Sequence, residues 1–495
     1  MSETIPEALR SAAVRWRDRP AYVDGDRSVS YAELLDLVER TSQVYVDSGA
    51  RGGDRIVLWG PNSIDWAVAA LAVSYAGAVL VPVNSRYVGA EVADVVARTG
   101  ARLVVVHDGF LGRNQVRELR DAGIRAVGLT SVADLMSAAV DAAGRQHEDL
   151  SPDDVADILF TSGTTGRSKG AMSAHRQTIG VARAWAELGG VREDDRYLVV
   201  NPFFHSFGYK IGIVVGLLTG CTLYPVATFD VDATMQLIED ERITVFPGAP
   251  TLYQSMLSAP GRSDRDLSSL RVAVTGAAVV PMVLIERMRD DLEIDQVVTA
   301  FGMTEAVVVT MCREGDSAAT VATTNGRAIP GMEIRIAGDG ELLVRGEFVM
   351  LGYLDDPEAT REAIDEDGWL HTGDIGTLDE RGNLAITDRI KDMYICGGFN
   401  VYPAEVEQVL MRLDGVVDAA VVGVPDERMG EVGKAYVVGS VDPEDVMTFA
   451  RERLANFKVP RTVELIDALP RNLGGKVLKT ALRDASSLGS SGTAP

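Results

Sequence analysis

The stretch Thr161-Ser-Gly-Thr-Thr-Gly-Arg-Ser-Lys-Gly170 follows the apolar run Val155–Phe160 and is the strongest local signal in the chain. Its glycines let the backbone approach a phosphate closely, its hydroxyls can donate to phosphate oxygens, and Lys169 adds positive charge. A Walker A loop would end in Gly-Lys-Ser/Thr, whereas here Ser168 precedes Lys169, so the hydroxyl that binds magnesium in that loop is absent. A polar surface loop is the plain alternative. The density of such residues and the two basic side chains favour a phosphate-binding turn after a strand.

Short apolar runs alternate with helical stretches on both sides of this loop, up to about residue 385. Arg55–Trp59, Ala78–Val83 and Ala101–His107 are each typical of a strand, and Ser63–Tyr75 is typical of a helix. This βαβ rhythm predicts a large N-terminal α/β domain with mostly parallel sheets and helices on both faces. Glu333–Leu354 alternates apolar and polar residues between glycines, which predicts antiparallel hairpins and a small β subdomain.

A smaller α+β unit is expected after Arg389, because helical and strand patterns alternate there over about 100 residues, enough for a domain. The chain of 495 residues is longer than one hydrophobic core usually serves, so at least two domains are expected. Residues 485–495 are rich in Ser and Gly, which predicts a disordered tail.

The chain carries a formal net charge of −24, from 72 acidic and 48 basic residues. Such a field repels phosphate backbones, so nucleic acid is not an expected partner, and a site for a phosphate-bearing small molecule must be locally basic or rich in backbone N–H groups. Cys221, Cys312 and Cys396 lie far apart without a CxxC pair, which indicates no disulfide framework or zinc site and fits a reducing cytoplasm. The N-terminal residues lack the apolar run of a signal peptide.

Trp66–Val83 carries no charge over 18 residues, so it has the length and the lack of charge of a candidate membrane span. Ser74, Gly77 and Pro82 interrupt this segment, and small alanines dominate it. A buried helix, a glycine turn and a buried strand explain it better, so no integral membrane span is expected.

A series of motifs follows the order found in the adenylate-forming superfamily, which includes acyl-CoA synthetases, luciferases and peptide-synthetase adenylation domains. The chain resembles this superfamily over nearly its whole length. The motifs are Thr161–Gly170, Pro202–His205, Thr299–Glu305, Gly326–Gly331, Trp369–Asp374, Asp388–Lys391, Gly397–Pro403 and Pro470–Lys476. Any one of them could arise by chance, but all of them in order leave little room for another family.

The resemblance implies formation of an acyl-adenylate and pyrophosphate from a carboxylic acid and MgATP, followed by transfer of the acyl group to coenzyme A. ATP, Mg²⁺ and CoA are the implied cofactors. Residues 1–388 would bind AMP and the acyl group, residues 389–391 would form a hinge, and residues 392–484 would form a mobile C-terminal domain. Lys391 occupies the hinge position, which absorbs the backbone rotation between two domain orientations.

The nucleotide-binding residues follow from the matched motifs. Thr304 and Glu305 come just after a predicted strand end, where open α/β sheets bind ligands, and a carboxylate there suits Mg²⁺. An isolated Glu305 would more simply be a surface residue; the resemblance makes it the metal ligand. In the phosphate loop, the implied ATP contacts are Thr161, Ser162, Gly163, Thr164, Thr165, Gly166 and Lys169. Phe301 and Gly302 are implied to lie near the adenine. The other implied contacts are Thr304, Asp374, Arg389 and Lys391.

Three residues are implied to take part in the chemistry. Attack of a carboxylate on the α-phosphate brings two anions together, and a lysine between them stabilises the developing charge, which is the role implied for Lys476. Thr304 would contact phosphate. His205 would lie where the substrate carboxylate meets the nucleotide, although a lone histidine is more often a core or surface residue.

The second half-reaction points to another loop. In relatives, the small domain rotates, removes the catalytic lysine and presents the loop that matches Gly397–Pro403, which opens a tunnel for the thiol. Gly397 and Gly398 suit the close approach of a thin pantetheine arm, so they are the expected CoA contacts. Cys396 lies beside this loop, but the nucleophilic thiol is expected to come from CoA rather than from the protein.

The resemblance also outlines an acyl pocket. Its implied lining is His205, Phe207, Ile211, Tyr253, Ala277 and Ala300. These side chains are mostly apolar or aromatic, so a hydrophobic acid fits better than an amino acid. Finer resemblance in Asn201–Lys210, Thr320–Thr324 and Asp392–Gly398 points to ligases that activate a propanoate on the two-ring remnant of steroid breakdown.

Other functions stay open at this point. A medium- or long-chain fatty acyl-CoA synthetase shares the same motifs, since a hydrophobic pocket discriminates weakly per methylene. A ligase that loads a carrier protein is a further alternative, although no carrier domain is fused here. A catalytically dead relative is disfavoured by the intact Lys169, Glu305, Asp374, Arg389 and Lys476. The sequence leaves the oligomeric state open, a homodimer included.

Overall fold

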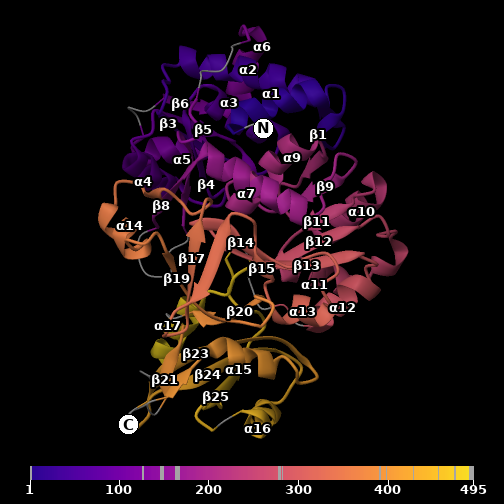
Figure 1. The fold of residues 1–495 in the computed structure, drawn as a ribbon, viewed down its shortest axis with the longest axis vertical. Coiled ribbons are helices and arrows are strands. Elements are labelled where there is room, and N and C mark those ends of the chain that lie inside the picture. The colour runs from indigo at the N-terminus through magenta and orange to yellow at the C-terminus, as the bar shows by residue number, and fades with distance from the viewer. Residues whose placement is uncertain are drawn as a thin grey trace.

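The computed structural model describes most of the 495-residue chain. The described residues are 3–124, 128–144, 150–161, 168–276, 280, 282–389, 392–396, 399–426, 428–454, 456–472 and 475–489. Figure 1 shows a large α/β part that contains the N-terminus and a smaller C-terminal unit, with a four-stranded sheet between them.

A seven-stranded sheet contains the strand that leads into the phosphate loop. Its order is β18-β8-β7-β4-β3-β5-β6, with parallel pairing from β7 to β6 and antiparallel pairing at the β18 and β8 edge. Its strands are β3 (Arg55–Trp59), β4 (Val79–Val83), β5 (Leu103–Val106), β6 (Gly128–Ser131), β7 (Val155–Phe160), β8 (Gly170–Ala174) and β18 (Gly352–Tyr353). The predicted strands at 55–59, 78–83 and 101–107 are therefore confirmed, the last with narrower bounds.

A nine-stranded sheet, in the order β15-β14-β13-β12-β11-β9-β10-β1-β2, forms the other half of the large part. Its middle strands pair in parallel, and its two edges are antiparallel. Its strands are β1 (Pro20–Asp24), β2 (Arg27–Ser30), β9 (Arg196–Val199), β10 (Thr222–Pro225), β11 (Val245–Pro247), β12 (Val272–Gly276), β13 (Gln296–Met303), β14 (Ala306–Met311) and β15 (Arg327–Ala328).

Helices cover and separate these two sheets (Figure 1). They are α1 (Ile5–Arg15), α2 (Tyr31–Asp47), α3 (Ile64–Tyr75), α4 (Gly89–Thr99), η1 (Phe110–Gly112), α5 (Gln115–Asp121), α6 (Val132–Asp141), α7 (His175–Leu188), α8 (Ser206–Gly208), η2 (Tyr209–Val214), α9 (Val215–Thr219), α10 (Val231–Glu241), α11 (Pro250–Ser258), η3 (Arg262–Asp264), α12 (Met282–Asp290), α13 (Ala318–Thr323) and α14 (Pro357–Ala363). The segment η2 is a π-helix, a form that often marks functional sites.

The uncharged run Trp66–Val83 is a buried helix and strand, as the sequence predicts. Ser63 caps α3 by accepting a hydrogen bond from the Trp66 backbone N–H, and Trp66 itself is fully buried. Gly77 takes a positive φ of 76°, which turns the chain into β4. In the described part of the chain, no helix is long and apolar enough to cross a membrane.

The antiparallel hairpins predicted near Glu333–Leu354 are present. The strands β16 (Met332–Ile336), β17 (Glu341–Gly346), β19 (Leu370–Leu378) and β20 (Leu384–Arg389) form an antiparallel four-stranded sheet in that order. It is the small β subdomain expected from the alternating pattern.

The C-terminal unit has its own sheet and its own hydrophobic clusters. Its strands are β21 (Tyr394–Cys396), β22 (Phe399–Val401), β23 (Val416–Asp426), β24 (Gly430–Gly439) and β25 (Thr462–Leu465), and its helices are α15 (Pro403–Leu410), α16 (Pro443–Arg453) and α17 (Lys479–Gly489). Its two described clusters contain only residues from Tyr394 onward. The predicted fold class, a large α/β domain followed by a smaller α+β domain, is confirmed.

The helix α17 extends five residues into the segment for which composition predicts disorder. Leu482 is buried in the C-terminal core, and its backbone carbonyl accepts a hydrogen bond from the Tyr436 hydroxyl at 3.0 Å. This anchor lets the helix continue to Gly489 despite its serines. Residues 490–495 lie outside the described residues.

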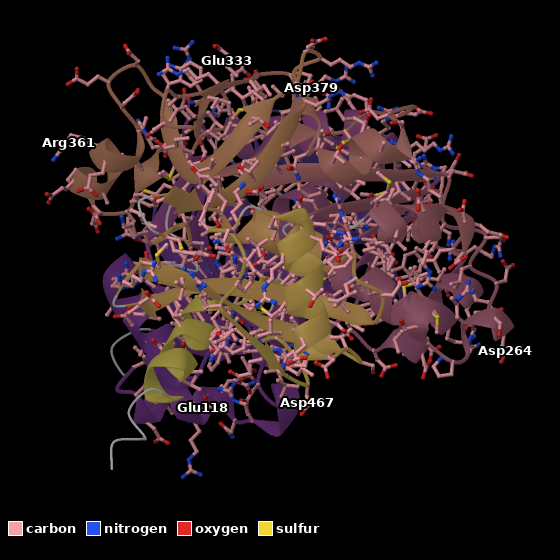
Figure 2. The ribbon with its side chains drawn as sticks, turned by 90° about the horizontal axis from the view of Figure 1, so that it is seen from below. Glu118, Asp264, Glu333, Arg361, Asp379 and Asp467 are labelled. Atoms are coloured by element: carbon pink, nitrogen blue, oxygen red, sulfur yellow. The ribbon has the colours of Figure 1, made fainter. Side chains whose placement is uncertain are left out.

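Seen from below, the C-terminal unit lies across the middle of the large part (Figure 2). Charged side chains such as Asp264, Glu333, Arg361 and Asp467 lie around the rim of this view, and all four are exposed.

Candidate active site

The base of the phosphate loop is closed by hydrogen bonds between its two ends. The Thr161 N–H donates to the Lys169 carbonyl at 2.8 Å, and the Lys169 N–H donates to Thr161 Oγ1 at 3.3 Å. These bonds continue the antiparallel β7–β8 pairing past Phe160 and Gly170. Ser162, Gly163, Thr164, Thr165 and Gly166 lie outside the described residues, so their phosphate contacts stay predictions.

Arg98, which lies in α4 and in none of the sequence motifs, contacts this loop through its side chain. Its guanidinium donates to the Ser168 carbonyl at 2.7 Å and lies over the Phe160 ring, with Cζ 5.0 Å from the centroid. Arg98 therefore touches both the strand before the loop and the residue before Lys169. Only the folded chain brings it there, because the bond spans 70 positions.

Thr304 and Glu305 form the tight turn between β13 and β14, as expected from their position after a strand. Met303 and Ala306 are cross-strand neighbours on either side of the turn. Glu305 is 8 % exposed, and its carbonyl accepts a hydrogen bond from the Met350 N–H at 2.8 Å. The metal carboxylate implied by resemblance is thus held on two rigid strands.

Tyr353 joins Glu305 to the phosphate loop. Its hydroxyl donates to Glu305 Oε1 at 2.7 Å, and Lys169 Nζ lies 5.0 Å from the centroid of its ring, within cation–π range. Burial and the neighbouring Glu305 charge raise the pKa of the Tyr353 hydroxyl, so it remains a donor. Three segments that are distant in sequence therefore meet at one tyrosine.

These residues fit a magnesium nucleotide. Within the described residues, no group of three or more His, Cys, Asp or Glu side chains is arranged to hold a metal ion. Mg²⁺ is usually held by one or two carboxylates together with substrate phosphates and waters, so a single carboxylate beside the base of a phosphate loop is the appropriate donor set. Glu305 would supply the carboxylate ligand for Mg²⁺, and Lys169 would bind the phosphate.

Close packing of two strands requires glycine at position 302, in addition to the nucleotide contact predicted for Gly302. A Cβ at this position would lie 1.9 Å from the Val307 carbonyl oxygen, so only glycine lets β13 and β14 approach here. The register of the hairpin shifts between Phe301 and Met303. Phe301 is partly buried against the core, which leaves part of the side chain accessible, as an adenine contact requires.

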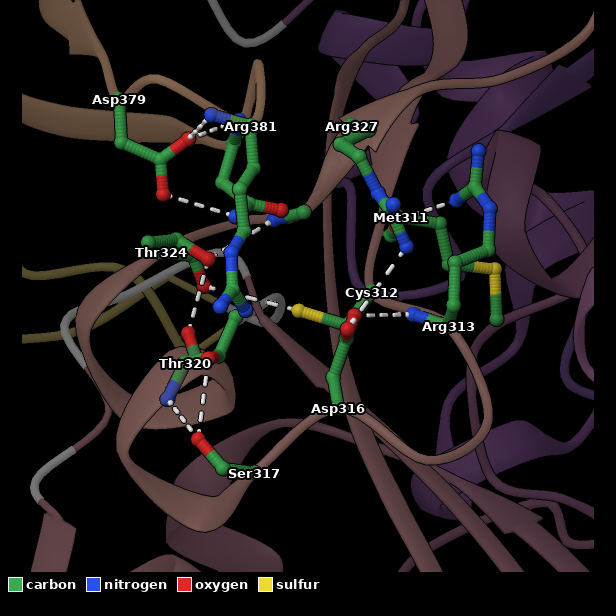
Figure 3. A network of polar contacts seen from close by, with 12 residues as sticks. Met311, Cys312, Arg313, Asp316, Ser317, Thr320, Thr324, Arg327, Asp379 and Arg381 are labelled. Carbon is green, nitrogen blue, oxygen red and sulfur yellow. Dashed lines mark hydrogen bonds and ion pairs between the residues drawn. The ribbon is translucent and has the colours of Figure 1, made fainter.

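A buried polar network stabilises the far end of this hairpin. Thr299 Oγ1 lies 3.2 Å from Cys312 Sγ and donates to the Thr324 carbonyl at 2.8 Å. Figure 3 shows Cys312 directed at Thr324, with Arg327 near Asp316 on the next turn. Burial raises the pKa of the Cys312 thiol, which favours its protonated, unreactive form.

Asp374 and Arg389, the expected ribose contacts, are direct cross-strand partners on β19 and β20. Asp374 is 2 % exposed, and its backbone N–H donates to Thr372 Oγ1 at 3.1 Å. Glu341, which the sequence did not single out, accepts from the Gly373 N–H at 2.9 Å and so supports the turn before Asp374. The side chain of Arg389 lies outside the described residues, as does Lys391.

His205 caps the short helix α8 at the start of the acyl segment. Its Nδ1 accepts a hydrogen bond from the Phe207 N–H at 3.1 Å. His205 is exposed to solvent, yet the protein around its ring desolvates the charged form and lowers its pKa. A contact of His205 with the substrate carboxylate stays a prediction.

The predicted acyl-pocket residues differ in their access to solvent. Phe207 is half-buried and packs edge-on against Trp185, with centroids 6.2 Å apart. Ile211 and Tyr253 are completely buried, so they would contact a substrate only after neighbouring side chains move. Ala300 is 9 % exposed, and Ala277 lies outside the described residues. The lining of the acyl pocket stays a prediction.

The loop that carries Lys476 faces the large part of the molecule. A Cβ on Gly475 would lie 3.2 Å from Ala249 Cβ, at the start of α11 and just after the C-terminal end of β11. Within the loop, the Lys476 N–H donates to Asn472 Oδ1 at 2.9 Å. The Lys476 loop therefore lies at the edge of the nine-stranded sheet where the strand ends converge. Gly397 and Gly398 lie outside the described residues.

A two-sheet α/β domain with a phosphate loop, an acidic turn and a lysine loop contributed by a small C-terminal domain defines an adenylate-forming enzyme. Residues 9–354 match the family model described as AMP-binding enzyme, and residues 405–476 match the AMP-binding enzyme C-terminal domain. The chain belongs to the AMP-binding enzyme family.

Two relatives are similar over nearly their whole length, and both are named 3-(7a-methyl-1,5-dioxo-octahydro-1H-inden-4-yl)propanoyl:CoA ligase. The protein from Rhodococcus jostii is 54 % identical over 97 % of this chain and 98 % of its own. The protein from Mycobacterium tuberculosis is 52 % identical with the same coverage. Among solved structures, ATP-bound MatB from Rhodopseudomonas palustris matches with a TM-score of 0.90 and 30 % identity, covering 98 % of this chain and 99 % of that one.

The protein is an ATP-dependent, AMP-forming acyl-CoA ligase that uses a carboxylic acid, ATP, Mg²⁺ and CoA. The expectation of an acid–thiol ligase is thus confirmed.

Proposed function

We propose that this ligase activates a steroid-derived propanoate carried on a methylated, dioxo bicyclic ring system. The observation that carries this proposal is the full-length similarity to two ligases named for that acyl group. A half-buried aromatic residue, Phe207, after His205 suits a bulky hydrophobic acid. Cytoplasmic location is also proposed, supported by three free, buried cysteines.

In the first half-reaction, the substrate carboxylate attacks the α-phosphate of ATP, and pyrophosphate leaves. Lys169 and the loop that begins at Thr161 would hold the outer phosphates, and Asp374 would accept hydrogen bonds from the ribose. Glu305 would ligate Mg²⁺, which supplies charge neutralisation on the phosphates. Lys476 would stabilise the charge that develops between the two anions.

In the second half-reaction, the CoA thiolate attacks the acyl carbon, and AMP leaves. We propose that residues 389–391 act as a hinge between the domain of residues 1–388 and the domain of residues 392–484. Rotation would withdraw Lys476 and bring Gly397 and Gly398 to the thiol path. The contact of Gly475 with Ala249 supports the adenylation orientation as the starting point.

Pyrophosphate release across a panel of acids, with and without CoA, tests the substrate. The panel contains the bicyclic dioxo propanoate, a ring-free propanoate, and medium- and long-chain fatty acids. We expect the highest kcat/KM with the bicyclic acid. A fatty acid that exceeds it would make the chain a fatty acyl-CoA synthetase, and adenylate that accumulates without thioester would indicate a carrier-protein acceptor.

The role of Lys476 is tested by separating the half-reactions. Lys476→Ala should abolish acid-dependent adenylate formation but leave thioester formation from supplied acyl-adenylate close to that of the wild type. The matched control is Lys479→Ala, a cation three positions away whose described partner is Glu407 at 2.8 Å within the C-terminal unit. Equal loss of both half-reactions in Lys476→Ala would contradict the rotation.

A further inference from the structure

Tyr353 occupies a position that no motif of the sequence analysis covers, yet it contacts two of the proposed catalytic groups. It belongs to β18, a two-residue strand that pairs antiparallel with β8, and it lies opposite Ala171. The next residue, Leu354, donates to the Gly170 carbonyl at 2.8 Å. The backbone of Tyr353 is therefore fixed to the strand that leaves the phosphate loop.

The same residue is held from its other side. Its N–H donates to Thr360 Oγ1 at 2.9 Å, a side chain of α14. Gly352 precedes it with a φ of 141°, and a Cβ there would lie 2.8 Å from Thr360 Cγ2. Thr360 and the edge of β8 thus fix the direction in which the Tyr353 ring projects.

The hydroxyl of Tyr353 leaves Glu305 with a defined orientation. It donates to Oε1 at 2.7 Å, so Oε2 is the oxygen left for a metal ion. A hydrogen bond to a carboxylate is charge-assisted and favours one rotamer of the side chain. Residues that orient a ligand in this way typically change metal affinity by about 10–100-fold when they are mutated.

The ring of Tyr353 makes a second contact, with Lys169. Lys169 Nζ lies over the ring at 5.0 Å from the centroid, while Glu305 bonds to the hydroxyl of the same ring; no ion pair within 4.0 Å joins Lys169 to Glu305 among the described side chains. A direct pair would have to break before phosphate and metal could bind. The ring therefore holds both charges ready for MgATP.

We propose that Tyr353 is a positioning residue for the magnesium–nucleotide site, whose hydroxyl orients Glu305 and whose ring separates Glu305 from Lys169. This role rests on the proposed function of Glu305 as the metal ligand. It adds to the motif residues a tyrosine that touches neither the reacting atoms nor the acyl group.

Direct metal binding tests the hydroxyl. Mn²⁺ binding is measured by electron paramagnetic resonance with the full-length protein and a non-hydrolysable ATP analogue, so the readout does not depend on turnover. Tyr353→Phe should raise the dissociation constant for Mn²⁺ about tenfold, while KM for the acid stays unchanged. The matched control is Tyr75→Phe, since the Tyr75 hydroxyl also donates to a carboxylate, Glu39 Oε1 at 3.0 Å, on helices remote from the site. That control should leave Mn²⁺ binding unchanged.

A second variant tests the ring. Tyr353→Leu removes both the hydroxyl and the aromatic ring, so Lys169 and Glu305 should form a direct ion pair. The KM for ATP should then rise, in addition to the loss of Mn²⁺ affinity. Thermal unfolding of both variants checks that the fold is retained. Equal effects of Phe and Leu on every parameter would overturn the role of the ring.

Glu305→Gln distinguishes failure of this inference from failure of the proposed site. If Glu305→Gln leaves Mn²⁺ affinity unchanged, Glu305 is not the metal ligand, and the proposed site is wrong. If Glu305→Gln weakens binding but Tyr353→Phe does not, only the role of Tyr353 is overturned. When Tyr353→Phe is added to the Glu305→Gln variant, it should have no further effect on Mn²⁺ affinity, and a full additive loss would contradict the coupling.

Discussion

A buried ion pair connects the strand before the phosphate loop to the segment after His205, and its removal should be costly. Lys210 Nζ in η2 lies 2.9 Å from Asp157 Oδ1 in β7, and the two side chains are 1 % and 0 % exposed. Thr178 Oγ1 donates to the second carboxylate oxygen at 2.8 Å. We therefore expect Lys210→Met to leave an uncompensated buried carboxylate.

The size of the effect follows from this geometry. Breaking a buried pair by removing one partner costs about 3–5 kcal/mol. An unfolding entropy of about 2.1 cal/mol/K per residue, over a domain of about 390 residues, is about 0.8 kcal/mol/K, so the unfolding midpoint should fall by about 4–6 °C. Lys210→Met with Asp157→Asn should recover most of this loss, because the amide oxygen still accepts from Thr178 while the charge is removed.

Differential scanning calorimetry at pH 7 measures these midpoints. The matched control is Arg287→Met, which breaks an exposed pair with Asp291 at 2.8 Å, where the two side chains are 44 % and 38 % exposed. Such surface pairs contribute about 0–1 kcal/mol, so the control should shift the midpoint by about 1 °C or less. A Lys210→Met midpoint as close to wild type as the control, or a double variant less stable than Lys210→Met, would refute the reasoning.

Three further outcomes are expected. Burial lowers the pKa of His175 to about 4, so the unfolded state takes up a proton at a higher pH than the folded state does. The free energy of unfolding should therefore fall by up to about 3 kcal/mol as the pH falls from 6.5 to 4. Urea titrations should find a smaller loss in His175→Gln. Gly302→Ala would place a Cβ 1.9 Å from the Val307 carbonyl oxygen. It should lower the free energy of unfolding by about 1–3 kcal/mol or more and impair ATP–pyrophosphate exchange. The control Gly338→Ala, which has open space around its Cβ, should change neither. Burial raises the pKa of the Cys221 thiol to about 12, so peptide mapping should find it unmodified by iodoacetamide at pH 8 until the protein is unfolded; rapid native alkylation would contradict this.

Much of the local structure was predictable because it follows from backbone chemistry. Strand bounds such as Arg55–Trp59 and the helix that begins after Ser63 depend on apolar periodicity and capping, which are visible in one stretch of chain. The position of Thr304 and Glu305 just after a strand was also predictable, whereas the turn that they form was not predicted. Helix α17 covers five residues of the segment expected as a tail, and its anchor at Leu482 is a tertiary contact that composition does not reveal; disorder of residues 485–495 stays a prediction.

The contacts that organise the site could not be read from these patterns. Tyr353 bonds to a carboxylate 48 positions away, and Lys210 in η2 pairs with Asp157 in strand β7. The predicted nucleotide contact of Gly302 stays a prediction, and the structure adds that its strand position tolerates no side chain. Such contacts depend on the order of strands in a sheet, and many orders are compatible with the same local periodicity.

The sequence by itself determined the class of protein, because its motifs follow the order of a known superfamily, and that resemblance implies the roles proposed for Lys169, Glu305 and Lys476. Only the tertiary structure decided that Tyr353 contacts both Lys169 and Glu305, that Arg98 bonds to the loop at Ser168, and that the loop carrying Lys476 faces the large domain. The physical reason is that distances between residues far apart in the chain are set by strand order and by the packing of the two domains, which no local pattern encodes.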